Sequence, residues 1–240
     1  MKLPLIFDRP WLNAAGCLGF APDVHGPISL QELGAFVTHP ISLRPRRAAR
    51  PPRVRAHPSG LALHSGHPNP GFSAALRTFG AKWARAPLPI MVHLLAEHPD
   101  ELRRMLSRLE ELENVLAVEV ALPPDSDAGL AADLLRAALG ELPIIGCVAA
   151  NRALELAPRM IESGASAVSL GAPRAKDETF SGRLYGPQLF ESTLNITREL
   201  AAEGIATIAG GGVYHAEQAR TLLEAGALAV QLDTVLWRGR

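Results

Sequence analysis

The sequence predicts a closed (β/α)8 barrel, the TIM barrel of the α/β class, with residues 1–240 forming one domain. Short apolar runs recur along the chain, and most are followed by a segment with helical spacing. Strict alternation of strand and helix over this length is typical of a parallel α/β architecture. Eight such runs in 240 residues favour a closed barrel over an open doubly wound sheet.

The predicted strands are continuously apolar and do not alternate apolar with polar residues. This pattern is typical of parallel strands that are covered on both faces. We predict the eight strands at residues 11–15, 35–39, 89–95, 116–122, 143–149, 167–172, 206–210 and 229–233.

The predicted helices carry Leu, Ile or Ala at i, i+3 and i+4, and three of them end on a glycine signal. They span residues 98–113, 127–140, 151–165, 186–204 and 215–227. Only TVLWRGR remains after the eighth strand, so we expect the closing helix to be truncated. Either a partner subunit covers the resulting apolar edge, or a short terminal turn capped by Trp237 closes it.

Composition narrows the class of protein. The 24 basic and 24 acidic side chains balance, so neither nucleic acid nor a membrane surface is indicated as a partner. The sequence lacks the run of about 18 apolar residues that a membrane helix needs, and MKLPLIFDRP lacks the apolar core of a signal peptide. Two cysteines, Cys17 and Cys147, fit a reducing compartment, and we expect a cytoplasmic protein.

The segment 41–71 is too long for a plain connection and is rich in Pro, Arg, Gly and His. A long loop on the catalytic face of a barrel is more often functional than idle. The arginines of this segment either bind an anionic ligand, contact a second subunit or form a solvent-exposed face. They are Arg44, Arg46, Arg47, Arg50, Arg53 and Arg55.

Five motifs, in order, resemble those of one known family. PWLNAAGCLGF resembles N-P-x-x-N-A-S-G, and GAFVTHPISLRPRRAARPPRV resembles G-A-x-x-T-K-(T/S)-x-(T/S)-x-x-P-R-x-x-N-x-x-P-R. LALHSGHPNPGF is similar to L-N-S-x-G-x-x-N-x-G, and GRLYGP to G-G-L-S-G-P. IAGGGVYHAEQARTLLEAGALAVQLDTVLW is similar to the closing G-x-G-G-I…AGA-x-x-V-Q-x-G-T. From about residue 3 to residue 237 the chain resembles a shortened, class 1-like member of the dihydroorotate dehydrogenase family.

The resemblance implies an oxidoreductase that holds flavin mononucleotide (FMN) at the carboxyl ends of the barrel strands. Such an enzyme oxidises a carbon–carbon single bond of a small, anionic substrate while a cysteine or serine takes a proton, a reaction of pyrimidine biosynthesis. We expect a homo-oligomer, with a dimer favoured. The resemblance assigns substrate binding to His64 and Asn69, and cofactor binding to Ala14, Ala15, Gly16, Gly186, Gly210, Gly211, Gly212 and Thr234.

Several family positions are occupied by different residues. His39 and Cys147 stand where the family has lysines, and we take them as the catalytic candidates. None of the three lysines, Lys2, Lys82 and Lys176, lies where it could substitute. Asp233 replaces a glycine at the phosphate end, where it either repels the phosphate or serves as an N-cap or a partner of Arg238.

The family's proton acceptor is also replaced. It belongs to a loop that reads VALPPDS here, in which Ala121 stands at an asparagine position and prolines follow. Asp125 or Ser126 would have to move in to serve as acceptor. The asparagine expected after the sixth strand is Ala172.

Two other functions stay open. A degenerate barrel without redox activity would bind a ligand or assemble with partners. Alternatively, His39, His93, Glu119 and Cys147 lie at or near neighbouring strand ends and offer N, O and S donors for zinc or iron, which would suit a metal-assisted hydrolase or lyase. The flavin oxidoreductase remains the leading interpretation.

Overall fold

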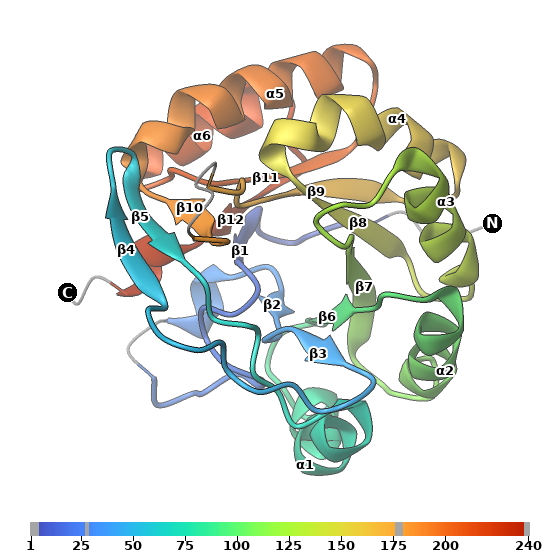
Figure 1. Ribbon diagram of the computed structural model, residues 1–240. Coiled ribbons are helices and arrows are strands. Elements are labelled where there is room, and N and C mark those ends of the chain that lie inside the picture. The colour runs from blue at the N-terminus through green and yellow to red at the C-terminus, as the bar shows by residue number, and fades with distance from the viewer. Residues whose placement is uncertain (1–4, 27–28, 176–179, 238–240) are drawn as a thin grey trace.

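The computed structural model, which describes residues 5–26, 29–175 and 180–237, confirms the predicted barrel (Figure 1). Lys2, Lys176 and Arg238 lie outside these residues. Eight parallel strands form its wall in the order β1-β12-β11-β9-β8-β7-β6-β2. They are β1 (Trp11–Asn13), β2 (Phe36–Val37), β6 (Ile90–Leu95), β7 (Val115–Ala121), β8 (Ile144–Ala149), β9 (Ala167–Gly171), β11 (Thr207–Gly210) and β12 (Ala229–Leu232).

The barrel closes between β1 and β2 through one backbone bridge, from Leu12 to Ala35, and through the side chain of Asn13. The Asn13 amide donates to the Val37 carbonyl at 2.6 Å and accepts from the Val37 amide at 2.9 Å. Because Asn13 is fully buried, this side chain replaces the strand hydrogen bonds that the two short strands lack.

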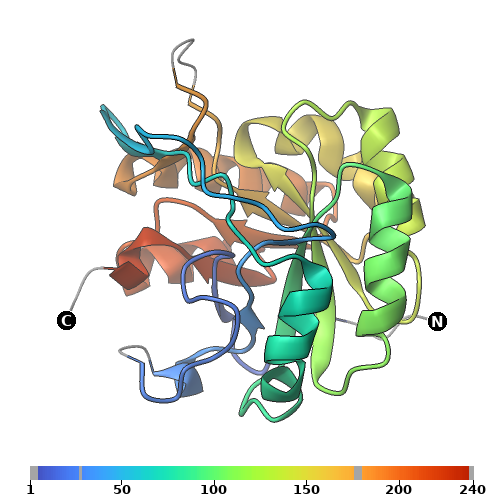
Figure 2. The same ribbon diagram turned by 60° about the horizontal axis from the view of Figure 1, so that its bottom comes forward.

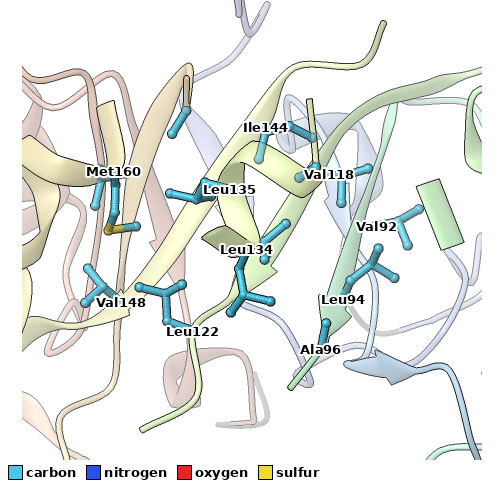
Figure 3. Packing of buried hydrophobic residues seen from close by; sticks show 14 of the residues in the cluster. Val92, Leu94, Ala96, Val118, Leu122, Leu134, Leu135, Ile144, Val148 and Met160 are labelled. Carbon is cyan, nitrogen blue, oxygen red and sulfur yellow. The ribbon is translucent and has the colours of Figure 1, made fainter. Parts of the chain in front are cut away.

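Helices cover the outside of the wall and end one to four residues inside the predicted ranges. They are α2 (Pro99–Leu109), α3 (Ala128–Ala137), α4 (Ala153–Glu162), α5 (Phe190–Ala202) and α6 (Ala216–Glu224), with 3-10 turns η2 (Ala150–Arg152) and η3 (Pro187–Leu189) before α4 and α5. Figure 3 shows Leu134 and Leu135 of α3 packed against Val118 and Ile144 of the wall. The α1 helix (Phe72–Ala84), with Gly80 inside it, was not predicted.

A second sheet lies above the carboxyl ends of the wall strands. It pairs β4 (Val54–His57), β5 (Gly60–Leu63) and β10 (Arg183–Tyr185), and in Figure 2 these segments project together from one end of the molecule. Gly60 has φ +132°, and a side chain there would collide with the Tyr185 carbonyl. The long segment 41–71 is therefore partly ordered, since β3 (Ile41–Ser42) also pairs with β6.

The chain after β12 forms a 3-10 turn, η4 (Thr234–Trp237), and a second such turn, η1 (Leu30–Glu32), precedes β2. The Trp237 indole donates to the Cys17 carbonyl at 3.3 Å, so the short terminal turn that we expected is present. Within the described residues, we find no helix long and apolar enough to cross a membrane.

Candidate active site

A cavity of about 350 Å³ opens at the carboxyl ends of the barrel strands, under the β4–β5–β10 sheet. Its wall combines residues from the ends of six strands with residues from the loops above. Eight of the predicted site residues line it: Ala14, Ala15, Gly16, His39, His64, Cys147, Gly210 and Gly211.

Four predicted site residues lie outside the lining. Gly186 and Gly212 are packed against backbone, the first against Ser59 and the second against Phe190 at the start of α5. Thr234 lies behind Asp233, which does line the cavity. Gly186, Gly212 and Thr234 therefore pack behind the cavity wall and do not form its surface.

Asn69, the fourth, is used within the protein. Its side-chain oxygen accepts from the Gly71 amide at 3.0 Å, and its nitrogen donates to the Ser42 hydroxyl and to the His67 carbonyl, both at 3.0 Å. It is buried, so these bonds fix the loop that carries His67. The geometry gives Asn69 a structural task.

Asp233 caps the terminal turn. Its Oδ1 atom accepts from the Thr234 amide at 2.5 Å and from the Thr234 hydroxyl at 3.1 Å, and its carbonyl accepts from Leu236. Asp233 thus stands at the first position before the turn and bonds to the residue that follows it, while the alternative partner, Arg238, lies outside the described residues. Burial raises the pKa of Asp233, although the bonds from Thr234 act in the opposite direction. Asp233 thus accepts from the amide and the hydroxyl of Thr234, at the end of the site where the resemblance places phosphate.

Three buried polar residues that line the cavity form what we call the floor network. His93 Nδ1 lies 2.5 Å from Glu119 Oε2, and Gln231 donates to Glu119 Oε1 at 2.8 Å. Burial alone would raise the pKa of Glu119, but the charge of His93 and the hydrogen bonds around the carboxylate bring it below its usual value. Glu119 is therefore held as a paired, buried carboxylate.

The alternative metal set is not assembled. Among the described residues, no three His, Cys, Asp or Glu side chains come together in an arrangement that could hold a metal ion. His93 and Glu119 bind each other in the floor network.

Two histidines, two cysteines and one tyrosine of the cavity favour their neutral forms. Burial lowers the pKa of His39 and, with nearby positive charges, lowers that of His67 to about 3. Burial also raises the pKa of the Cys17 thiol to about 12, helped by Asp233, and that of Cys147 to about 12, helped by Glu119. Burial likewise raises the pKa of the Tyr185 phenol.

The loop after β7 offers no proton acceptor to the cavity. Ala121, Pro123 and Pro124 line it, whereas Asp125 pairs with Arg174 at 2.6 Å on the outside. Ser126 is buried and donates its hydroxyl to the Pro123 carbonyl at 2.8 Å. Neither Asp125 nor Ser126 is free to replace the lost family residue.

Sequence reasoning missed Arg183 and Tyr185, which project from β10 and line the cavity. Of the six arginines in the segment 41–71, only Arg46 does so. A signal was present, because GRLYGP has a large side chain at two places where G-G-L-S-G-P has glycine and serine.

Comparisons with known proteins agree with this fold and motif order. A family model described as Dihydroorotate dehydrogenase matches residues 3–132, more than half of the chain. The dihydroorotate dehydrogenase B (NAD(+)) catalytic subunit of Desulforudis audaxviator is 33% identical over 126 residues, which cover 52% of this chain and 41% of that relative. The subunit of the same name from Thermodesulfovibrio yellowstonii is 29% identical over 258 residues, covering 96% of this chain and 84% of the relative.

A solved structure shows the same barrel. The crystal structure of DHODH from Eimeria tenella in complex with ferulenol gives a TM-score of 0.73 at 16% identity. The match covers 95% of this chain and 76% of that one, and at this identity it supports the fold alone.

Proposed function

The chain belongs to the dihydroorotate dehydrogenase family, and from this premise we propose that it is an FMN-dependent oxidoreductase acting on a carbon–carbon bond of a small, anionic ring compound. One observation carries the proposal. The cavity lies at the carboxyl ends of the strands, where barrel enzymes place their chemistry, and small residues form much of its wall. Its volume of about 350 Å³ falls within the range of small-molecule sites.

The small residues fit a flat ring with a phosphate tail. Ala14, Ala15 and Gly16 follow β1, while Gly210 ends β11 and Gly211 follows it. A Cβ atom added at Gly210 would lie 3.1 Å from the Leu170 carbonyl, and one at Gly211 would lie 3.2 Å from the Thr193 hydroxyl. Both glycines line the cavity and carry no side chain, so a ligand can approach their backbone there.

The phosphate end also accepts the group, although less openly. Asp233 occupies the donors of Thr234, and its carboxylate would repel a phosphate bound beside it, although burial raises the pKa of this group. Gly210 and Gly211 line the same cavity and leave their backbone to the tail.

Bound FMN would supply the two-electron chemistry. Oxidation of a carbon–carbon single bond also releases a proton, which we assign to a ring nitrogen of His39, because this imidazole is neutral at pH 7 and lines the cavity at the end of β2. Cys147 keeps its proton and shapes the wall beside it. With His39 as the acceptor, the rate stays level as pH falls from 8 to below the usual imidazole pKa, and His39→Gln lowers kcat.

Titration with FMN, followed by quenching of flavin fluorescence, tests the cofactor. Ala121→Trp fills the cavity at the end of β7 and should weaken FMN binding at least about tenfold, because an overpacked site must shift its neighbours. The control is Ala81→Trp, on the exposed side of α1. A wild-type protein that stays colourless after incubation with FMN would refute the proposal. A loaded protein is then assayed with dihydroorotate and an electron-accepting dye.

The cap made by Asp233 favours a second candidate, a barrel that binds an anionic ligand without redox chemistry. The same titration separates the two, since this candidate predicts no FMN binding.

We also propose that the protein is a cytoplasmic homodimer. Both cysteines are free thiols, which suits a reducing compartment, and Trp237, half-exposed at the edge after β12, offers an apolar surface to a second copy. Light scattering after gel filtration measures the mass, and a monomer at micromolar concentration would contradict the dimer.

A further inference from the structure

Three arginines line the cavity, and they differ in how their charge is balanced. Arg46 pairs with Glu97 at 3.4 Å, and Arg174 pairs with Asp125 at 2.6 Å and also donates to Ser181 at 3.2 Å. Arg183 donates to the Ala172 carbonyl at 2.7 Å but forms no ion pair with a carboxylate in residues 5–26, 29–175 and 180–237. Among the described residues, Arg183 is thus the one arginine of the cavity that is not paired with a carboxylate.

The position of Arg183 directs this charge toward the ligand space. It lies on β10 opposite Leu63 of β5, in the sheet above the barrel. Cys147, His67 and Tyr185 line the cavity with it, and the charge of Arg183 acts on all three: it adds to the lowering of the His67 pKa and opposes the rise that burial causes in the other two. The cation therefore lies among residues that all face the same space.

The neighbours of Arg183 offer it no counter-charge. Both thiols and the Tyr185 phenol keep their protons, and the acidic groups that face the cavity from the strands are already engaged. Glu119 is bonded to His93 and Gln231, and Asp233 is bonded to Thr234. A half-buried cation with unused donors is costly until an anion binds it.

A guanidinium has five donors in a planar fork, and within the described residues that of Arg183 makes one hydrogen bond, to the Ala172 carbonyl. The remaining edge matches the two oxygens of a carboxylate. Phosphate is the other common partner of a guanidinium. We have assigned the phosphate of FMN to the backbone of Gly210 and Gly211, which belong to a later motif of the sequence than Arg183.

We propose that Arg183 is the specificity-determining residue of this site and that it binds the carboxylate of a small planar ring substrate under the β4–β5–β10 sheet. The inference rests on the proposed function, which it deepens by naming the group that selects the substrate. The family motif has glycine at this position, so the contact belongs to this chain's own sequence.

The test compares two ligands that differ by the carboxylate alone. Orotate and uracil share a pyrimidine ring, and calorimetry measures the Kd of each for the FMN-loaded protein and for the protein without flavin. Arg183→Gln should raise the Kd of orotate on the order of 10- to 100-fold, because a charge-assisted hydrogen bond is lost. The Kd of uracil should not change. Arg183→Lys should recover part of the affinity, since it keeps the charge and loses the fork. Arg174→Gln removes an equal charge that is already paired and is the matched control.

The outcomes separate this inference from the proposed function. If the wild type binds FMN but Arg183→Gln binds orotate as tightly as before, the inference is wrong and the flavoenzyme stands. An equal loss of orotate and uracil, a loss of FMN affinity instead, or a wild type that binds no orotate would also overturn it. If the wild type binds no FMN but its orotate affinity still depends on Arg183, the proposed FMN dependence is wrong and the carboxylate contact is supported.

Discussion

Two regions of the barrel interior treat buried polar groups in opposite ways. In the floor network, His93, Glu119 and Gln231 are bonded to one another and need nothing from outside. We define the mouth as three residues that line the cavity, Arg183, His67 and Asp233. Arg183 has no paired carboxylate among the described residues, His67 stays neutral because its pKa is lowered, and Asp233 bonds to Thr234 of the neighbouring turn. Paired polar groups stabilise the fold, whereas a polar group buried without a partner costs free energy that a bound ligand can recover.

The largest expected effect is in the floor. Glu119→Ala leaves His93 and Gln231 without their buried partner, so the free energy of unfolding should fall by about 3–5 kcal/mol. Urea unfolding at pH 7, followed by circular dichroism, measures it. A variant as stable as the wild type would mean that the floor network contributes nothing to the fold.

The second effect belongs to the mouth and concerns binding. Asp233→Gly restores the residue that the resemblance expects, removes a carboxyl group from the phosphate end and frees the donors of Thr234. FMN affinity should rise on the order of tenfold or more, because a like charge near the phosphate is lost. Riboflavin, which has no phosphate, is the control ligand and should bind both proteins equally.

This variant also has a pH signature. Since the pKa of Asp233 is raised above 3.8, its neutral form persists to higher pH in the folded protein. Wild-type FMN affinity should therefore fall as pH rises through that pKa, by more than it falls in Asp233→Gly. Parallel pH profiles for the two proteins would show that Asp233 does not face the phosphate.

The third effect is a change in acid stability. His67 is neutral in the folded protein down to about pH 3 but takes a proton near pH 6.5 when unfolded, so it costs stability as pH falls through this window. His67→Asn removes the cost and suits the left-handed backbone at φ 50°. At pH 4.5 the variant should gain about 1 kcal/mol, allowing for partial solvent exposure. Urea midpoints at pH 4.5 and 8 measure it, and an equal change at both would exclude titration of His67.

The wall of the barrel was predictable because its signal is local. Each strand is a continuous apolar run, and the observed bounds agree with the predicted ones to within two residues, as at 144–149 against 143–149. The β4–β5–β10 sheet was not predicted. Its strands are short and partly exposed, and β10 lies far along the chain from its partner β5, so no apolar pattern marks them.

The site divides in the same way. Small residues such as Gly16 and Gly210 were found because motif order fixes their place at strand ends. Arg183 was missed because its importance depends on which carboxylates its neighbours already use, and a sequence does not show pairing. Asn69 was predicted to bind substrate, which stays a prediction, and its amide also holds the loop, a role that only the hydrogen bonds reveal.

The smallest effect tests whether burial is what distinguishes the two regions. Glu97 also pairs with a basic residue, but its side chain is 66% exposed and that of Arg46 is 41% exposed, whereas Glu119 is 1% exposed. Glu97→Ala should therefore change the free energy of unfolding by less than about 1 kcal/mol, and raising the salt concentration should remove even that. Urea unfolding at low and high salt measures both. If Glu97→Ala cost as much as Glu119→Ala, burial would not explain the stability of the floor, and the argument that an unpaired Arg183 awaits an anion would lose its physical basis.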